Sequence, residues 1–532
     1  MTQSTEKYSS EDKTVRPIGA ENASSDADYD DIETGAVDEK KLLGKLDLRL
    51  LPGVAVLYLL SFLDRSNVAN AKLEGLTKDL GMTGNQYLTS LTLYFVGYVL
   101  FEVSLASTCP PIILYCPSPP EIGFVPLPWS IKLTTTPQIP CNVILKRTTP
   151  KIWLPTLTLV WGIVATLMGV AQNMEGFFAV RFFLGVTESG LFPGVVYYLS
   201  NWYKRTERVY RVALFFSAAS LAGAFGGILA FGIGKMNGVA DLKGWRWIFI
   251  IEGLLTVVVS LFGYLFINNY PSTAGFLSPK ERKAVLSRLT SDSDSTADEP
   301  FNWNAVLTCL RDPKCWLYGA VFHSLSLPLY TLSLFLPTII KDLGYTAARA
   351  QLLTVPPYAL ATLLTITVAI ISERLHHRSS FMIGAAILAV VGYAILIGNA
   401  HHVSSRPGVS YAGTFLAAGG IYPATALGLA WPAMNVAGQT KRATSCALQI
   451  SVGNLGAVIG TQIYRPRTAP GYVTGHSVAL AYMAANAMIV GLLWFVLTRE
   501  NRRKESELGA AGSEAPTGQM RGDEDLRWKF KV

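Results

Sequence analysis

Charged residues are scarce in this chain of 532 residues. Asp, Glu, Lys and Arg together make up 15% of the sequence, whereas an ordinary soluble domain carries about 25%. Hydrophobic residues make up half of it. Apolar runs of roughly 20 residues recur along the chain, and each is long enough to cross about 30 Å of hydrocarbon. The composition therefore excludes a soluble globular protein and predicts an α-helical protein that crosses a membrane many times.

Motifs for metal, disulfide or nucleotide chemistry are also missing. The six cysteines show no metal-ligand spacing and no disulfide framework. No Gly-rich phosphate loop of the GxxxxGK[ST] type occurs, which argues against an ATP-driven pump. The adjacent pairs His376–His377 and His401–His402 lack the spacing that a membrane metalloenzyme needs. We therefore expect no catalytic residues, no metal and no cofactor, and predict that the protein is not an enzyme.

The first 40 or so residues lack the apolar core of a signal peptide. They are polar and rich in Ser, Asp and Glu, which predicts a disordered tail over 1–44. The net charge of the whole chain is +8, but the cations lie in short loops between apolar runs. Membrane topology explains such a distribution better than nucleic-acid binding does, so no nucleic-acid partner is expected.

Twelve apolar segments are long enough to span a bilayer, so the expected fold is an all-α membrane protein with twelve transmembrane helices. A polar stretch, 269–314, separates two sets of six. This division predicts two six-helix bundles, 45–268 and 315–498, joined by a central loop and followed by a polar tail, 499–532. The expected spans are 48–66, 86–103, 152–171, 178–199, 210–232, 247–268, 315–338, 351–372, 380–398, 409–430, 443–463 and 478–498.

Basic residues gather in alternate loops, which sets the expected orientation. The loops of one side carry Lys40, Lys41, Lys45, Arg49, Lys146, Arg147, Lys151, Lys204, Arg205, Arg208, Arg211, Arg374, Arg378, Lys441, Arg442, Arg499, Arg502, Arg503 and Lys504. Loops rich in Lys and Arg stay in the cytoplasm, so the central loop and both termini are expected there. We expect a monomer in the plasma membrane.

The segment 104–139 does not fit this plan. It contains eight prolines, and each interior proline costs a helix about 3 kcal/mol, so the segment cannot be a spanning helix. It is also too apolar for a typical solvated loop. Without it, the end of span 2 would join a short basic turn directly. Our hypothesis is that this insertion is a translated intron or a gene-model error; the alternative is a genuine cytoplasmic insertion.

Four ionisable residues fall inside expected spans, where charge is costly and usually functional. Asp64 and Arg65 lie in span 1, and Arg181 and Glu188 lie in span 4. Arg181 and Glu188 are seven residues apart, so they share a helix face about 10 Å apart along the axis. Burial favours the protonated carboxyl group and a nearby cation favours the ionised one. Balanced in this way, Glu188 could carry a proton; the alternative is that these charges only hold helices together.

Other polar residues of the spans could line a path for a solute, although such residues more often link helices by hydrogen bonds. The candidates for substrate contact are His323, Tyr330, Asn435, Gln449 and Asn454. Glu102, Glu252 and Glu373 are expected nearer the membrane interfaces, as gate or packing charges.

Several motifs taken together resemble those of a known family. The chain is similar to the major facilitator superfamily, within it to the anion:cation symporters, and within these to the fungal allantoate and nicotinate permeases. The resemblance covers about 45–500, apart from 104–139. It rests on LDLRLLPGVAVLYLLSFLDRSNVANAK, RFFLGVTESGLFPG, NWYKRTER, GWRWIFIIEG, YPSTAGFLSPKER and NLGAVIGTQIYRPRTAPGY.

This resemblance implies two bundles that rock about a central site and move organic anions with protons. It implies that Asp64 and Glu188 carry protons, and that Arg65 and Arg181 recognise the anion, since a guanidinium matches a carboxylate bidentately. The resemblance also implies gates between spans 2 and 3 and after span 8. Their residues here are Lys146, Arg147, Glu373, Arg374 and Arg378.

The sequence departs from the family at these gates. CNVILKRTTPK replaces the usual loop signature between spans 2 and 3, and Glu373 stands where Asp is usual. The insertion interrupts the first gate, and if translated it is expected to impair activity.

Function is therefore expected to be proton-coupled uptake of a small carboxylate. Nicotinate and allantoate are favoured, while pantothenate, biotin or dicarboxylates stay open. A non-transporting nutrient sensor on the same fold is the alternative from another class.

Overall fold

The computed structural model describes residues 38–106, 149–291, 303–375, 377–511 and 522–532, and throughout these residues the regular elements are helices. In this part of the chain, ten helices are long and apolar enough to cross a membrane. The helix α3 (Gly84–Ala106) and the pair α6 (Met174–Glu188) and α7 (Leu191–Ser200) lie at the expected second and fourth spans. The arrangement is consistent with the twelve spans predicted. The insertion 104–139 lies almost wholly outside the described residues.

The N-terminal half contains six helical segments of membrane length. These are α1 (Glu39–Leu73), α3, α5 (Pro150–Met168), α6 with α7, α8 (Arg205–Gly234) and α9 (Gly244–Phe266). The C-terminal half contains α12 (Pro313–Asp342), α13 (Ala347–Leu353) with α14 (Val355–Leu375), α15 (Arg378–Gly398), α16 (Pro407–Asn435), α17 (Gln439–Gly460) and α18 (Val473–Ala511).

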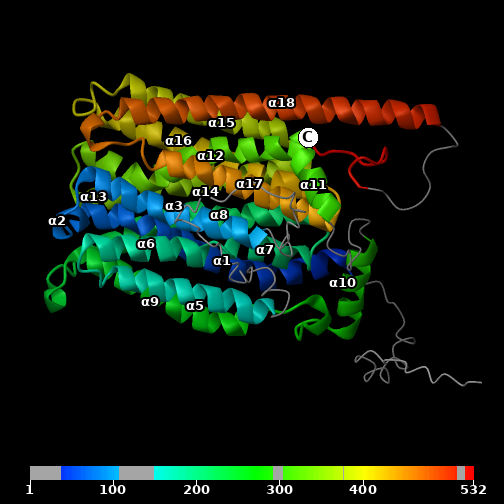
Figure 1. The fold of residues 1–532 in the computed structure, drawn as a ribbon, viewed down its shortest axis with the longest axis horizontal. Helices are drawn as coiled ribbons and strands as arrows, with labels where there is room; N and C mark the ends of the chain where they lie inside the picture. Colours follow the sequence, from blue (N-terminus) through cyan, green and yellow to red (C-terminus); the bar gives the residue numbers. More distant parts are fainter. Residues whose placement is uncertain (1–37, 107–148, 292–302, 376, 512–521) are drawn as a thin grey trace, which may run out of the picture.

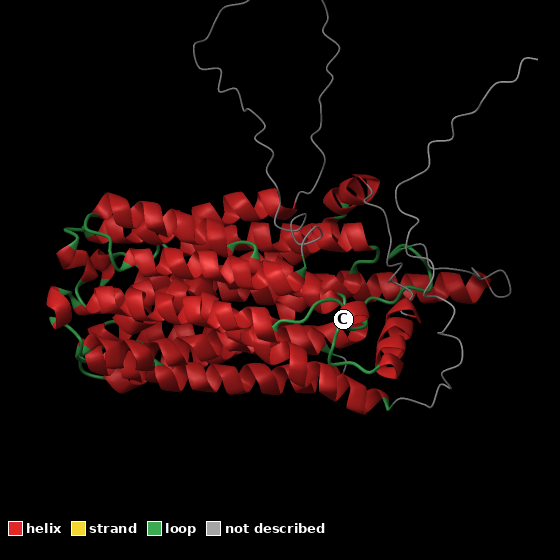
Figure 2. Cartoon of the chain, turned by 90° about the horizontal axis from the view of Figure 1, so that it is seen from below, coloured by secondary structure: helices red, strands yellow, loops and turns green. Residues whose placement is uncertain are grey.

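The long helices run side by side, and the two halves form the lower and upper parts of Figure 1. The start of α1, the end of α18 and residues 522–532 lie at one end of the bundle, called the near end below; the opposite end is the far end (Figures 1 and 2). The helices α1 and α12, α3 and α17, and α8 with α14 and α16 pack across the boundary between the halves. These helices therefore enclose the centre of the molecule.

Burial separates central helices from peripheral ones. In the most apolar stretch of α12, 89% of residues are buried, against 39% in α9. The outer face of α9 exposes Leu254, Leu261 and Phe262. A helix with such an exposed apolar face is suited to hydrocarbon rather than water, so α9 faces lipid and α12 forms part of the core.

The fourth span is interrupted, whereas the sequence predicted one continuous helix over 178–199. The structure ends α6 at Glu188 and begins α7 at Leu191. Pro193 explains the break, because it has no N–H to donate to the carbonyl of Ser189 four residues earlier. The interruption falls directly beside the predicted proton carrier Glu188.

The central loop is largely helical and is tied to the N-terminal half. It contains α10 (Pro279–Ser291) and α11 (Trp303–Arg311). Lys45 of α1 donates to both carboxylate oxygens of Glu281 at 2.7 and 2.9 Å. This bond and those from Ser278 hold the pKa of Glu281 below its ordinary value. The pairing anchors α10 beneath the near end of α1.

The last residues pack back onto the C-terminal half, where the sequence predicted a plain polar tail. The side chains of Trp528 and Phe530 are buried. The amide of Asn435 exchanges hydrogen bonds with the Lys531 backbone at 2.8 and 2.9 Å, and Lys441 donates to the Asp523 carboxylate at 2.8 Å. These contacts join 522–532 to the near ends of α16 and α17.

Candidate functional site

All four predicted charges, Asp64, Arg65, Arg181 and Glu188, are at most 5% exposed. They come from only two helices: α1 carries the first two and α6 carries the others. Because each ionised group would be expensive to leave unpaired in a lipid-shielded interior, the contacts of each are informative.

Arg65 joins the two halves of the molecule. Its Nε and Nη2 donate to Oε2 of Glu188 at 3.4 and 3.3 Å, and its Nη1 donates to the Tyr330 hydroxyl of α12 at 2.8 Å. Aromatic rings surround the guanidinium, with centroids 5.2 to 5.7 Å away: Phe62, Tyr94, Tyr98 and Tyr330. Cation–π attraction to these rings stabilises a desolvated guanidinium. Arg65 is thus held in place by the rings, by Tyr330 and by one oxygen of Glu188, and not by a bidentate carboxylate pair.

Glu188 receives bonds on one oxygen only. Tyr94 of α3 donates its hydroxyl to Oε2, the same atom that Arg65 binds. Within the described residues, Oε1 is buried and has no hydrogen-bond partner. One side of this carboxyl group is therefore available for a proton.

Close packing of α3 on α6 makes the bond from Tyr94 possible. A Cβ on Gly185 would lie 2.9 Å from the Tyr94 carbonyl carbon and from the Tyr98 nitrogen. Only glycine fits this crossing, one turn from Glu188. The glycine thus brings the two tyrosines of α3 to the charged pair.

Arg181 lies two turns along α6 from Glu188, over the Phe177 ring with its centroid 5.7 Å away. Its Nε and Nη2 are buried and, in the part of the chain that the structure describes, have no hydrogen-bond partner. The titratable groups near it include Glu188 and the uncharged hydroxyl groups of Tyr87 and Tyr94. Two unused donors on a buried cation are the kind of group that an anion would satisfy.

Asp64 faces away from Arg65, although the two are adjacent in sequence. Thr256 of α9 donates to its Oδ2 at 2.9 Å. The structure therefore pairs Arg65 with Glu188, leaves Arg181 two turns away on α6, and turns Asp64 toward a separate contact inside the N-terminal half.

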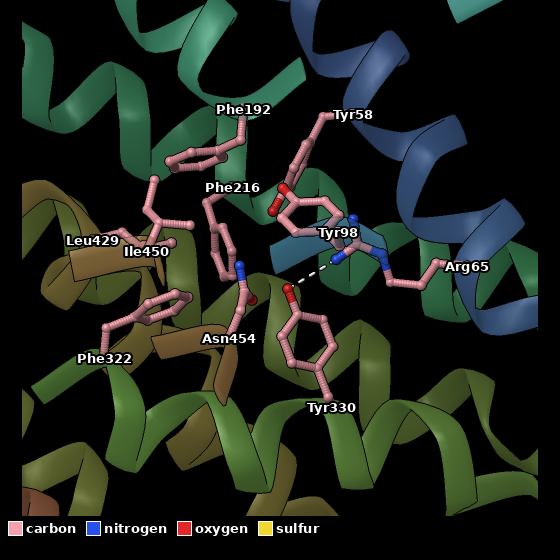
Figure 3. Close-up of a pocket in the computed structure, with 10 residues that line it drawn as sticks. All are labelled: Tyr58, Arg65, Tyr98, Phe192, Phe216, Phe322, Tyr330, Leu429, Ile450 and Asn454. Carbon is pink, nitrogen blue, oxygen red and sulfur yellow. Dashed lines mark hydrogen bonds between the residues drawn. The ribbon is translucent and has the colours of Figure 1, made fainter. Parts of the chain in front are cut away.

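Arg65 also lines a cavity between the two halves (Figure 3). Tyr58 lies seven residues before Arg65 on α1, so the cavity extends about two turns from Arg65 toward the near end. The cavity is narrow in this conformation, with a volume of about 20 Å³. Its lining residues are Tyr58, Arg65, Tyr98, Phe192, Phe216, Phe322, Tyr330, Leu429, Ile450 and Asn454.

Of the five polar residues predicted to contact substrate, Tyr330 and Asn454 line this cavity. The other three bond elsewhere. Nδ1 of His323 lies 2.9 Å from the Val452 carbonyl, and Nε2 of Gln449 donates to the Gly428 carbonyl at 2.8 Å. The amide of Asn435 binds the tail, as described above. These contacts indicate that His323, Gln449 and Asn435 link segments of the protein by hydrogen bonds.

Of the five predicted gate residues, Glu373, Arg374 and Arg378 lie within the described residues. Lys146 and Arg147 lie outside the described residues. Arg378 is buried, pairs with Glu373 and approaches the Met434 sulfur, while Arg374 is exposed. This ion pair joins the end of α14 to the start of α15 at the near end.

The sequence analysis did not predict most of the aromatic side chains that surround Arg65 and the cavity. Tyr94 and Tyr98 are four residues apart on one face of span 2, and Tyr58 shares a face with Arg65 two turns away. That spacing was the available signal. In the described residues, no group of three His, Cys, Asp or Glu side chains is placed to hold a metal ion.

Comparison with known proteins agrees with this architecture. The sequence model of the Major Facilitator Superfamily matches residues 116–461. The MFS-type transporter cnsO of Penicillium expansum is 35% identical, over 90% of this chain and 89% of that protein. The high-affinity nicotinic acid transporter of Saccharomyces cerevisiae is 29% identical, over 92% and 85%.

Solved structures give the same fold. A bacterial homologue of the human lysosomal transporter Spinster, in an inward-facing and unoccupied conformation, aligns with a TM-score of 0.58. The alignment covers 84% of this chain and 96% of the homologue at 14% identity, so the likeness shows the fold alone. Fold, family match and relatives agree, and the chain is a multi-pass membrane protein that belongs to the major facilitator superfamily.

Proposed function

We propose that this protein is a secondary active transporter that imports a small organic carboxylate together with protons. The observation that carries the proposal is the position of Arg65. It lies at the boundary of the two halves, lines the cavity, and binds one oxygen of the buried Glu188 carboxylate. The other oxygen has no hydrogen-bond partner among the described residues.

Competition for Arg65 would couple the proton to the anion. With Glu188 ionised, Arg65 is held by its charge. When a proton binds Oε1, Glu188 becomes neutral and the guanidinium can take a substrate carboxylate through two parallel hydrogen bonds. Arg181, with its unused donors on the same helix face as Glu188, would add attraction for the anion. Substrate and proton would then cross together, because each favours binding of the other.

Aromatic side chains around the cavity favour a flat substrate. Phe192, Phe216, Phe322 and Tyr330 surround the space that opens from Arg65, and such rings stack well on another aromatic ring. A pyridine carboxylate such as nicotinate meets both requirements. The similarity to a nicotinic acid transporter supports the same choice, while allantoate stays a candidate because it also carries a carboxylate.

Hydrogen bonds between the halves support alternating access. Thr92 and Thr461 lie 2.7 Å apart, Gln462 donates to Thr92 at 2.7 Å, and Gln351 donates to Glu74 at 3.0 Å. These contacts lie between Arg65 and the far end, whereas the cavity extends toward the near end. With the near end in the cytoplasm, as the basic loops favour, this conformation would be closed to the outside. We place the protein in the plasma membrane with both termini in the cytoplasm.

Uptake by cells that express the protein tests the proposal. Labelled nicotinate, allantoate, pantothenate, biotin and succinate are supplied at acidic and neutral outside pH, with and without a protonophore. We expect uptake of a monocarboxylate that is greater at acidic pH and is lost with the protonophore. Uptake that changes neither with outside pH nor with the protonophore would refute proton coupling. Expression of the protein without any uptake would favour the sensor alternative.

A further inference from the structure

Two buried carboxylates, Asp64 and Glu252, lie near each other inside the N-terminal half. Glu252 of α9 was expected near a membrane interface, but its side chain is 0% exposed. It faces α1, the helix that also carries Asp64, which is 1% exposed. Neither group contributes to the cavity that Arg65 lines. The transport scheme above therefore leaves Glu252 without a role, and Asp64 has only the proton-carrying role that the family resemblance implies.

Four side chains, called the cluster below, form two hydrogen-bonded pairs between α1 and α9. Asn67 donates its Nδ2 to Oε2 of Glu252 at 2.5 Å, and Thr256 donates to Oδ2 of Asp64 at 2.9 Å. Asp64 and Asn67 are three residues apart on α1, and Glu252 and Thr256 are four apart on α9, so each pair shares a helix face. The two carboxyl groups are therefore neighbours across a single helix contact.

No cation compensates this pair. In the described part of the chain, neither carboxylate forms a salt bridge, and the nearby Arg65 is paired with Glu188 instead. Among the titratable groups of the helices packed here, Asp64 of α1 acts on Glu252, and Glu188 of α6 acts on Asp64. The helix α5 brings Trp161 beside Asp64, and α8 brings Gly226 beside Asn67. Two adjacent negative charges without a partner are strongly disfavoured in such an interior.

Two acceptor atoms of the cluster have no hydrogen-bond partner in the described residues, Oδ1 of Asn67 and Oε1 of Glu252. Each of these atoms is buried. Both bonds that the structure gives to the cluster are donated by neutral side chains and reach the other oxygens. A proton on Oε1 would leave those bonds intact and would reduce the charge of the pair to at most one.

We propose that Glu252 shares the proton-binding role that the family resemblance implies for Asp64, so that these two carboxyl groups together hold one proton at a site distinct from Glu188. The proposal rests on the proton-coupled transport proposed above. The proton binds a lone pair of Oε1 to form an O–H bond, and on release it returns to water as hydronium.

Helix α1 links this site to the substrate. Asp64 and Arg65 are consecutive residues that point to opposite partners, Thr256 on α9 and Glu188 on α6. A shift of α1 that frees Arg65 for an anion therefore also changes the distance between the two acids. Proton occupancy of the acidic pair and anion occupancy of Arg65 are thereby coupled.

The variant Glu252→Gln tests this site, because the amide keeps an acceptor for Asn67 but cannot exchange a proton. Wild type and variant are reconstituted into vesicles, and labelled nicotinate is measured in two ways: net accumulation driven by a pH gradient, and exchange at equal pH. We expect accumulation to fall by about tenfold and its dependence on outside pH to flatten, with exchange retained. Ser260→Ala, which removes a buried hydroxyl bonded only to its own helix, should change neither.

The outcomes separate the two proposals. If wild type shows no proton-driven accumulation, the proposed function itself fails. If wild type accumulates nicotinate and Glu252→Gln accumulates it with the same pH profile, the second proton site is wrong. Should Glu252→Gln fail to fold, Glu252→Asp restores an acid at this position; it should accumulate nicotinate with a displaced pH profile, and an unchanged profile would overturn the proposal.

Discussion

Tyr330 supplies the only contact in the described structure by which the C-terminal half reaches Arg65 with a hydrogen bond. Its hydroxyl accepts from Nη1 at 2.8 Å, so the guanidinium is oriented by one residue from each half. A substrate that binds Arg65 must therefore also meet Tyr330. Arg65 and Tyr330 lie on opposite sides of the boundary between the two halves.

Replacing Tyr330 by Phe removes this acceptor and keeps the ring. A hydrogen bond to a charged group contributes about 2 kcal/mol, so we expect the KM for the transported carboxylate to rise by about tenfold to thirtyfold with little loss of protein. Uptake kinetics measure it.

Tyr264→Phe is the matched control, because it removes a tyrosine hydroxyl that lies 2.8 Å from Thr156 on the lipid-facing helices. It should leave KM unchanged. Equal effects of both substitutions would mean that Tyr330 acts on the fold and not on the anion.

At this scale the sequence predicted the charges but not their pairing. Asp64, Arg65, Arg181 and Glu188 stand out because ionisable residues are rare in apolar runs. Their partners could not be predicted, because Thr256, Tyr94 and Tyr330 lie far away in sequence and meet the charges only after helices pack. The adjacent Asp64 and Arg65 looked like one pair and belong to two.

Among the elements, the crossing of α3 and α6 decides the geometry of the site. Gly185 allows the backbones of α3 and α6 to approach closely where Tyr94 reaches Glu188. The helix ends after Glu188 because Pro193 has no N–H to donate to the carbonyl of Ser189. The helix contact and the helix break thus both fall within one turn of Glu188, the proposed proton carrier.

Gly185→Ala is expected to push these helices apart. The added Cβ would meet the Tyr94 backbone, which cannot rotate away, and such overpacking costs about 1–3 kcal/mol. We expect a lower thermal midpoint in detergent and weaker transport. Gly232→Ala on α8 is the control, since nothing lies within 4 Å of its Cβ, and it should not lower the midpoint. An unchanged midpoint for Gly185→Ala would contradict the close crossing.

Helix positions were predicted better than helix ends. Apolar runs of membrane length located the spans, because the bilayer sets their length. The sequence did not predict that α1 begins at Glu39, that the central loop forms α10 and α11, or that residues 522–532 pack on the C-terminal half. These features depend on long-range pairs such as Lys45 with Glu281, which a local pattern does not contain.

For the whole molecule, the contacts between the halves define one conformational state. Thr92 of α3 and Thr461 at the end of α17 meet at 2.7 Å, so cysteines at both positions should form a disulfide in this state. We expect Thr92→Cys/Thr461→Cys to lose transport under oxidation and to regain it on reduction.

Each single cysteine variant is the control and should transport under both conditions. Transport by the cross-linked double variant at the normal rate would show that these two helices do not separate during the cycle.

The central claim is that a proton and a carboxylate cross the membrane together through the site of Arg65 and Glu188. The most direct measurement records the pH inside proteoliposomes, with a trapped dye, when nicotinate is added outside at equal pH. Protein-free liposomes correct for diffusion of the neutral acid. The account predicts nicotinate-dependent acidification with wild type, and none with Glu188→Gln, which should still exchange labelled nicotinate. Nicotinate entry through wild type without acidification, or equal acidification by both proteins, would contradict it.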